Sequence, residues 1–425
     1  MNKWYDVDKI RSQFPALKRK INGQPIIYLD GPGGTQVPQR VADKVTEYLL
    51  HHNANAGGHF VTSQESDAIL SSARVKLADF LGCRAAEIMF GESSTTNNFK
   101  LTFALVRDMN KGDEVIITDL DHESNRSLWR HMEEKGIVVK RVAVNPADCT
   151  MNMEDYKEKI SDKTKVVALN WASNGVGTIT DIKPMIKIAK EAGAVTIVDA
   201  VHYAPHKPID VKDTGMDFLL CSPYKFFGPH MGVLYGREEL MDQLRTYRVL
   251  VEDNINPPEK FETGTPQFES ITGSAEAVEF IASIGQYCET WAIENHPEWM
   301  KELTGRRRLV VAGMLAINAY QEPLAKKIKT ALRTLSKVTI YGPKEGDPCT
   351  STISFVVEGM LAEEVAKKLG EKGICVWHGH YYAKELINNV LGLETVGGLV
   401  RIGLAPYNTE EEIDRTIAAI KEIIS

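Results

Sequence analysis

Two charged residues stand at positions where a folded chain rarely leaves a charge. Asp199 ends an apolar, β-branched run at 195–198, which is typical of a buried strand. Lys225 follows a second short apolar run at 218–221 and has aromatic neighbours on both sides. An isolated buried charge costs several kcal/mol, so such residues are usually paired or functional.

A carboxylate and an amine placed in this way suit a pyridoxal phosphate site. The lysine would hold the cofactor aldehyde as a Schiff base, and the acid would keep the pyridine nitrogen protonated. Structural explanations also exist. A carboxylate at a strand end is often a helix cap, and a lysine beside aromatic rings often lies along them with its amine in water. Asp199 and Lys225 alone leave both explanations open.

Composition limits the classes of protein to consider. A chain of 425 residues exceeds the usual single domain, which favours one large and one smaller domain. A hydrophobic content of 43% and a charged content of 25% are typical of a globular protein in water. The net charge of −7, without a long basic run, argues against nucleic acid and anionic membrane as partners. No signal-peptide core or membrane-spanning run is evident, so we expect a cytoplasmic protein.

Cysteine and histidine spacing predicts neither disulfides nor a metal site. The six cysteines are widely scattered and form no CxxC pair. His378 and His380 lie two residues apart, but the sequence offers no nearby third ligand for a metal.

Strand and helix patterns alternate through the first two thirds of the chain. We expect strands at 26–30, at 87–90, within EVIITDLDH before His122, and from 166, and helices at 37–50, at about 66–81 and at 181–192. This rhythm predicts an α/β fold with a largely parallel sheet, in which ligands bind beyond the carboxyl ends of the strands. Polar side chains at or just after such ends are Ser94, Thr95, His122, Asn174, Asp199 and Lys225. Their combination favours a pyridoxal phosphate enzyme.

The hydroxyl-rich run at 93–96 stands just before one of these helices. A helix N-terminus favours an anion, so Ser94 and Thr95 would suit a phosphate group. An ordinary Ser/Thr helix cap explains the same residues equally well.

The last third of the chain predicts a smaller α+β domain. We expect a long helix at 302–320 that Pro323 interrupts, a helix at 326–335, and strands at VTIYG, STISFVVEG and ICVW. The final helix has a capping box formed by Thr409 and Glu412. The predicted large domain covers 36–299, and the small domain combines 1–35 with 300–425.

Several segments together resemble a known family. DAVHYAP and SPYKFFGPHMGVLYG are similar to the cofactor-lysine region of the class V aminotransferase superfamily, the fold-type I pyridoxal phosphate enzymes that include cysteine desulfurases. The resemblance extends from YLDGPGGTQVP through FGESSTTNN, DLDHESN, SNGVGT and ETGTPQFE to RIGLAPYNTEEEID. Each motif is weak alone, but their order and spacing are specific. The resemblance implies a mainly parallel sheet of the seven-stranded type.

The resemblance also implies residue roles. Lys225 would be the Schiff-base lysine and proton shuttle, Asp199 would partner the pyridine nitrogen, and His122 would stack on the cofactor ring. The other implied cofactor-binding residues are Ser94, Thr95, Asn174, His202, Ser222 and Tyr224. Thr265 would reach the phosphate of a neighbouring subunit, which implies a homodimer.

Arg401 would clamp the substrate carboxylate, with His380 and Tyr381 beside it. The sequence keeps simpler roles open for two of these residues. Arg401 precedes the half-buried pattern IGLA and would also suit a structural ion pair. His122 would also suit a capping role.

One departure from the family pattern bears on the reaction. Cysteine desulfurases carry a nucleophilic cysteine in a loop similar to RTGHHCA, whereas this chain reads WHGHYYA, with Tyr382 at the cysteine position. The last cysteine, Cys375, lies in an apolar run that favours an inert thiol.

We therefore expect carbon–sulfur or carbon–selenium lyase chemistry on a small α-amino acid, without a persulfide. Tyr381 or Tyr382 would supply a second proton donor. An epimerase, an aminotransferase and a catalytically silent binding protein are the alternatives.

Overall fold

The computed structural model describes residues 4–249 and 255–425. A seven-stranded sheet organises the larger part of the chain, in the order β4-β12-β11-β10-β9-β5-β6. Strands β11, β10, β9, β5 and β6 run parallel, and β12 is antiparallel to both β11 and β4. The strands are β4 (Ile88–Gly91), β12 (Gly232–Gly236), β11 (Phe218–Cys221), β10 (Val195–Asp199), β9 (Thr164–Asn170), β5 (Glu114–Thr118) and β6 (Val138–Val142). This sheet confirms the predicted α/β class.

Helices cover both faces of this sheet, so its central strands are apolar on both sides. Ile197 packs in the core that includes residues of α4 (Ser94–Val106). The next residue, Val198, packs in the core that includes residues of α7 (Ile182–Glu191). Successive side chains of a strand point to opposite faces, which explains the continuous apolar run before Asp199.

Three long helices pack together on the side of the sheet that α7 covers: α3 (Val61–Leu81), α10 (Phe268–Asn295) and α12 (Gly305–Arg333). They are accompanied by α2 (Gln39–Glu47). Helices α10 and α12 approach each other closely at two glycines. A Cβ atom on Gly285 would lie 1.8 Å from the carbonyl oxygen of Leu309, and one on Gly313 would lie 2.3 Å from that of Ile281.

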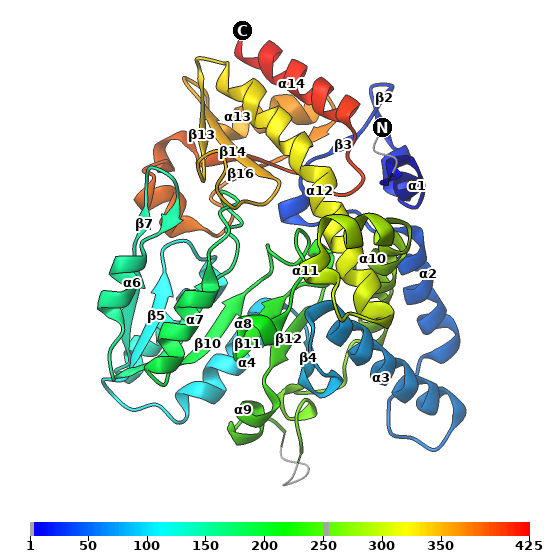
Figure 1. The fold of residues 1–425 in the computed structure, drawn as a ribbon, viewed down its shortest axis with the longest axis vertical. Helices are drawn as coiled ribbons and strands as arrows, with labels where there is room; N and C mark the ends of the chain where they lie inside the picture. Colours follow the sequence, from blue (N-terminus) through cyan, green and yellow to red (C-terminus); the bar gives the residue numbers. More distant parts are fainter. Residues whose placement is uncertain (1–3, 250–254) are drawn as a thin grey trace.

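A second, four-stranded antiparallel sheet forms the upper part of the molecule in Figure 1. Its order is β13-β14-β17-β16. Helices α13 (Ala362–Glu371) and α14 (Glu410–Ile424) pack against it, and the predicted capping box of Thr409 and Glu412 is present in α14. The strands are β13 (Val338–Tyr341), β14 (Thr352–Val357), β17 (Leu399–Gly403) and β16 (Trp377–Gly379).

The N-terminal segment joins this smaller part. Strand β3 (Ile27–Tyr28) pairs in parallel with β15 (Ile374–Cys375). Helix α12 contributes residues both to the core beneath the seven-stranded sheet and to the core of the smaller sheet. The division of the chain at residues 36 and 300 therefore stays a prediction.

Shorter elements connect these parts. The remaining α-helices and strands are α1 (Val7–Ser12), α5 (Ser127–His131), α6 (Met153–Lys159), α8 (Val211–Thr214), α9 (Glu238–Gln243), α11 (Pro297–Met300), β1 (Lys20–Ile21), β2 (Gln24–Pro25), β7 (Val144–Asn145) and β8 (Thr150–Met151). Single turns of 3₁₀-helix occur at Gly31–Gly33, Glu123–Asn125 and Pro223–Lys225, among other places, and π-helical turns at Tyr48–His52 and Glu385–Val390.

Three sequence predictions about the smaller part are wrong in detail. Pro323 lies inside α12 and does not end it. A proline costs about 3 kcal/mol in a helix interior. The helix persists because its residues are buried against α10 before Pro323 and against the smaller sheet after it.

The run ICVW forms two strands, β15 and β16, which pair with different partners. Arg401 does not precede a half-buried strand, because it lies in the middle of β17, which is buried throughout. The apolar pattern alone does not show that both faces of β17 are covered.

Within the part of the chain that the structure describes, no helix has the length and apolar character needed to cross a bilayer.

The contact between α10 and α12 yields a prediction about stability. We expect Gly285→Ala to lower the free energy of unfolding by about 1–3 kcal/mol, because the added methyl group would force the two helices apart. Gly370 lies in α13 with nothing within 4 Å of its Cβ position. Gly370→Ala is the matched control and should stabilise the protein slightly. Denaturant unfolding measures both changes, and equal stability of the two variants would contradict this description of the contact.

Candidate active site

A cavity of about 900 Å³ lies beyond the carboxyl ends of β5, β9, β10 and β11 and beside the smaller sheet. It brings together every site residue predicted from the sequence except Thr265. The predicted residues on its wall are Ser94, Thr95, His122, Asn174, Asp199, His202, Ser222, Tyr224, Lys225, His380, Tyr381, Tyr382 and Arg401. Thr265 is exposed and does not line this cavity, so its role toward a neighbouring subunit stays a prediction.

Lys225 lies in the 3₁₀ turn that follows β11, and only 8% of the residue is exposed. Its ammonium group donates a hydrogen bond to the carbonyl oxygen of Pro32. Burial and the neighbouring Arg401 guanidinium lower the pKa of Lys225 to about 7, although Asp199 opposes the shift. The amine therefore does not extend along its aromatic neighbours into water.

Asp199 ends β10 and is 6% exposed. Its carboxylate accepts a hydrogen bond of 2.9 Å from the backbone N–H of Val201. Burial raises the pKa of Asp199 to about 6, and Lys225 limits the shift. Within the described residues no cation lies at ion-pair distance from it. Asp199 is thus a buried acid on the cavity wall.

His122 combines the two functions that its position allows. Its Nδ1 accepts the backbone N–H of Ser124 at 3.0 Å and contacts the Ser124 hydroxyl at 2.8 Å, so the predicted capping role is correct. The ring also forms part of the cavity wall. Burial lowers the pKa of His122 to about 4, with Lys225 and Arg401 contributing, so the imidazole is neutral near pH 7.

The run at 93–96 is both a cap and a cavity wall. Ser93 caps α4 by accepting the N–H of Thr96 at 3.0 Å. The Ser94 hydroxyl donates to the carbonyl of Cys221 at 2.6 Å and contacts the Ser222 hydroxyl at 2.7 Å. A Cβ atom on Gly232 would lie 2.3 Å from the backbone of Ser93, so only glycine allows this approach. The first N–H groups of α4, which have no acceptor within the helix, are therefore held at the cavity.

Arg401 is 3% exposed and projects from β17. Its Nη1 donates to the carbonyl of Asn174 at 2.7 Å, and its guanidinium carbon lies 3.9 Å from the ring centroid of Tyr381. Its buried Nε has no hydrogen-bond partner among the described residues. Among residues 4–249 and 255–425 no carboxylate lies within 4.0 Å of this guanidinium, so the alternative of a structural ion pair is wrong. Burial lowers the pKa of Arg401 to about 10.

The two neighbouring tyrosines have different environments. The Tyr381 hydroxyl donates to the carbonyl of Leu399, and burial raises its pKa. Tyr382 is 66% exposed, and its ring centroid lies 5.3 Å from that of His122. In the described part of the chain, the Tyr382 hydroxyl has no hydrogen-bond partner. His380 supports this turn, because its Nδ1 accepts the backbone N–H of Tyr382 at 3.1 Å.

His202 and Tyr224 complete the predicted wall. The Nε2 of His202 contacts the hydroxyl of Thr352 at 2.9 Å, while its buried Nδ1 has no hydrogen-bond partner in residues 4–249 and 255–425. Burial lowers the pKa of His202 well below its usual value, so the ring is neutral. Tyr224 stacks on His230 with a centroid distance of 4.8 Å.

Sequence reasoning missed Asn170, His131 and Trp377, which also line the cavity. Asn170 ends β9 and pairs in register with Asp199, and its buried Oδ1 has no hydrogen-bond partner in the described chain. The strand-end rule that selected Asp199 applies equally to Asn170. No comparable signal marks His131 or Trp377, which come from α5 and β16.

The donors and acceptors of this cavity fit pyridoxal phosphate. A buried amine, a buried acid and a helix N-terminus match the aldehyde, the pyridine nitrogen and the phosphate of that cofactor. Buried side-chain atoms of Asn170, Asn174 and His202 have no hydrogen-bond partner within the part of the chain that the structure describes, and these three residues lie on the same wall.

None of the six cysteines lines the cavity. Cys221 is buried at the end of β11, and Cys375 is half-buried in β15, where burial raises its pKa to about 11. Within the described residues, no group of three His, Cys, Asp or Glu side chains could hold a metal ion.

Comparisons with known proteins agree with this geometry. The profile of the family "Aminotransferase class-V" matches residues 27–304 and 307–416. The aminotransferase-like protein FGM3 of Gibberella zeae is 31% identical over 99% of both chains. A cysteine desulfurase of Haloferax volcanii is 29% identical over 98% of this chain and 96% of its own.

A solved structure has the same fold. The apo structure of the cysteine desulfurase from Thermococcus onnurineus NA1 superimposes with a TM-score of 0.85 and 26% sequence identity, and the match covers 98% of each chain. The chain is therefore a pyridoxal phosphate-dependent enzyme that belongs to the class V aminotransferase family.

Proposed function

We propose that this enzyme is a carbon–sulfur or carbon–selenium lyase that acts on a small α-amino acid without forming a persulfide on a cysteine. The observation that carries the proposal is the absence of any cysteine from the cavity wall, together with Tyr382 beside His122. The thiols of Cys221 and Cys375 are turned into apolar surroundings, where burial raises their pKa values and disfavours the nucleophilic thiolate.

In this proposal Lys225 has two tasks. Its amine would hold the cofactor aldehyde, and the same amine, when free, would remove the proton from the substrate α-carbon. The lowered pKa of about 7 supports both tasks, because much of the amine is unprotonated near neutral pH. When bound, the cofactor supplies an electron sink for the bond that breaks at the α-carbon. Asp199 would keep a proton on the pyridine nitrogen, and His122 would offer a neutral ring to the face of the cofactor.

Arg401 would bind the substrate carboxylate. Its guanidinium is fully buried, it has no carboxylate partner within the described residues, and its Nε is unpaired. The Asn174 carbonyl and the Tyr381 ring fix its plane. A planar, prepositioned guanidinium binds a carboxylate through two parallel hydrogen bonds, which orients the α-carbon toward Lys225.

Tyr382 would donate a proton to the departing sulfur. Its hydroxyl is free of protein partners in the described chain, whereas the Tyr381 hydroxyl is engaged with Leu399. For cysteine, Lys225 would take the α-proton and the departing hydrosulfide would take the Tyr382 proton, so that hydrogen sulfide and an unsaturated amine form, and water converts this amine to pyruvate and ammonia. His380 and Tyr381 would border the substrate, and Ser94, Thr95, Ser222 and Tyr224 would surround the phosphate, with Thr265 contributed by the second subunit of a homodimer.

Product analysis tests the reaction. We expect the holoenzyme to convert a cysteine-type substrate to pyruvate, ammonia and sulfide in equal amounts. Alkylation of the accessible thiols with N-ethylmaleimide, followed by removal of the reagent, should leave the rate unchanged. Alanine together with a protein-bound persulfide would contradict the proposal. An inverted amino acid would instead identify an epimerase, and a keto acid with the aminated cofactor would identify an aminotransferase.

Replacement of Tyr382 tests its proton transfer. We expect Tyr382→Phe to lower kcat for elimination by about 100-fold, because a positioned general acid contributes roughly that much. Exchange of the substrate α-proton with deuterated water should continue, since Lys225 is intact. Tyr287 is a surface tyrosine on α10, 62% exposed, and Tyr287→Phe is the control. Full activity of Tyr382→Phe would show that another group donates the proton.

A further inference from the structure

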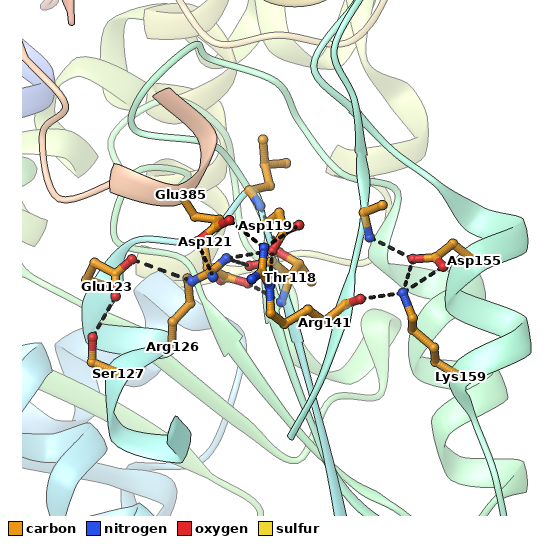
Figure 2. Close-up of polar contacts among 12 residues, drawn as sticks. Thr118, Asp119, Asp121, Glu123, Arg126, Ser127, Arg141, Asp155, Lys159 and Glu385 are labelled. Carbon is orange, nitrogen blue, oxygen red and sulfur yellow. Dashed lines mark hydrogen bonds and ion pairs between the residues drawn. The ribbon is translucent and has the colours of Figure 1, made fainter. Parts of the chain in front are cut away.

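Two arginines and two carboxylates form a cluster beside the cavity, as Figure 2 shows. Arg126 is fully buried and donates to Asp119 at 2.9 Å from Nη1 and to Glu385 at 3.2 Å from Nη2. Arg141 donates to the same Asp119 oxygen at 3.0 Å from Nε and to Glu385 from Nη2. Each arginine thus bridges the same two carboxylates, and we call these four residues the Asp119 cluster.

The Asp119 cluster joins two segments that are far apart in the sequence. The loop after β5 contains residues 119–126, and we call it the His122 segment. Asp119 and Arg126 are its first and last residues and flank His122. Glu385 begins the π-helical turn that directly follows the tyrosine segment (residues 379–384). Arg141 lies in the neighbouring strand β6 and supports both carboxylates. The two segments form adjacent parts of the cavity wall.

A backbone hydrogen bond links the same two segments, because the N–H of Glu123 donates to the carbonyl of Tyr382 at 2.8 Å. Asn174, which lies outside both segments, also holds the tyrosine segment, because its side chain donates to the carbonyl of Tyr381 at 2.7 Å. The Asp119 cluster therefore lies where the tyrosine segment ends, and Tyr382 within that segment contacts the His122 segment directly.

The tyrosine segment needs such support because its backbone is unfavourable. Tyr381 and Tyr382 have φ angles of 52° and 60°, which place two successive non-glycine residues in the left-handed region. Residues in this region persist only where surrounding contacts hold them, and they are frequent at functional sites.

The Asp119 cluster itself does not line the cavity. Buried ion pairs also add little net stability, because removing the charges from water offsets most of their attraction. A fully buried arginine with two carboxylate partners is better explained as a residue that fixes geometry. The guanidinium group is planar, so its N–H groups can donate only to partners in a narrow range of positions.

We propose that the Asp119 cluster positions the tyrosine segment against the His122 segment and so sets the place of the Tyr382 hydroxyl at the cavity. Asp119, Arg126, Arg141 and Glu385 are positioning residues, because none of them lines the cavity. The consequence for catalysis rests on the proton transfer proposed above for Tyr382, whereas the positioning itself does not depend on it.

Hydrogen exchange of the cofactor-free protein tests the positioning. We expect Glu385→Gln to speed exchange of the backbone amides at 379–384 and of the Glu123 amide by about tenfold, because the lost charge loosens both bridges. Asp217 is a matched control: it is 2% exposed and pairs with Arg237 at 3.2 Å away from the cavity. Asp217→Asn should leave these amides unchanged. Equal exchange in wild type and Glu385→Gln, or the same increase in both variants, would overturn the proposal.

A milder variant covers the case in which Glu385→Gln does not fold. Arg141 is partly exposed, and Arg141→Lys keeps its charge while removing the two-pronged bridge. It should increase exchange of the same amides in a protein whose thermal unfolding is close to that of the wild type. Unchanged exchange in a folded Arg141→Lys would also overturn the proposal.

Kinetics of the holoenzyme test the consequence for Tyr382. We expect Glu385→Gln to lower kcat for elimination by about 10- to 100-fold, since a small misplacement of a reacting group has effects of this size. In the Tyr382→Phe background the same change should cause almost no further loss, because both act on one proton transfer.

An equal loss in both backgrounds would show that the cluster acts on the whole site and would overturn the link to Tyr382. If Tyr382→Phe alone is fully active, the proposed proton donor fails, and the exchange data still decide the positioning.

Discussion

The cavity depends on the burial of basic and acidic side chains in a small volume. Lys225 and Arg401 are each less than a tenth exposed, and burial lowers the pKa values of both. Two acids oppose these shifts: Asp199 and Asp30 both raise the pKa of Lys225, and Asp30 also raises that of Arg401. Burying these ionisable groups together is costly, and it becomes favourable when anionic groups of a cofactor and a substrate complete the site. The sheets, turns and caps around the cavity serve to hold these groups in place.

Each sheet contributes a different part of the site. The parallel strands of the larger sheet end at Asp199 and Asn170, and the turn after β11 presents Lys225. The smaller sheet contributes Arg401 from the middle of β17. A rigid strand positions a guanidinium more precisely than a loop would. The residues proposed to hold the cofactor and the arginine proposed to bind the substrate therefore come from separate cores that α12 connects.

Sequence reasoning reached the parts of this site that obey local rules. The carboxyl-end rule for parallel strands selected Asp199, His122, Asn174 and Lys225 because an apolar run and the polar residue after it are adjacent in the chain. The same rule covers Asn170. This residue was overlooked because it lies inside the predicted strand that begins at residue 166 rather than after it.

Features that depend on distant partners were not accessible in this way. The environment of Arg401 follows from burial of both faces of β17, which local periodicity does not reveal. Pro323 signals a helix end, yet packing of α12 on two cores outweighs that signal. Arg126 and Glu385 are 259 positions apart, so no spacing pattern could pair them. In each case tertiary burial decided between alternatives that the local sequence left open.

The most direct test of this account is the pH dependence of cofactor capture by the cofactor-free protein. Pyridoxal phosphate would be added across a pH series, the covalent link reduced with borohydride, and the labelled lysine located by peptide mass spectrometry. A lysine reacts as its free amine, and the lowered pKa of about 7 makes that form abundant above neutral pH. We predict labelling of Lys225 at a rate that rises through about pH 7 and then levels off. Labelling spread over surface lysines, with a rate that rises only toward the ordinary lysine pKa of 10.5, would contradict the account.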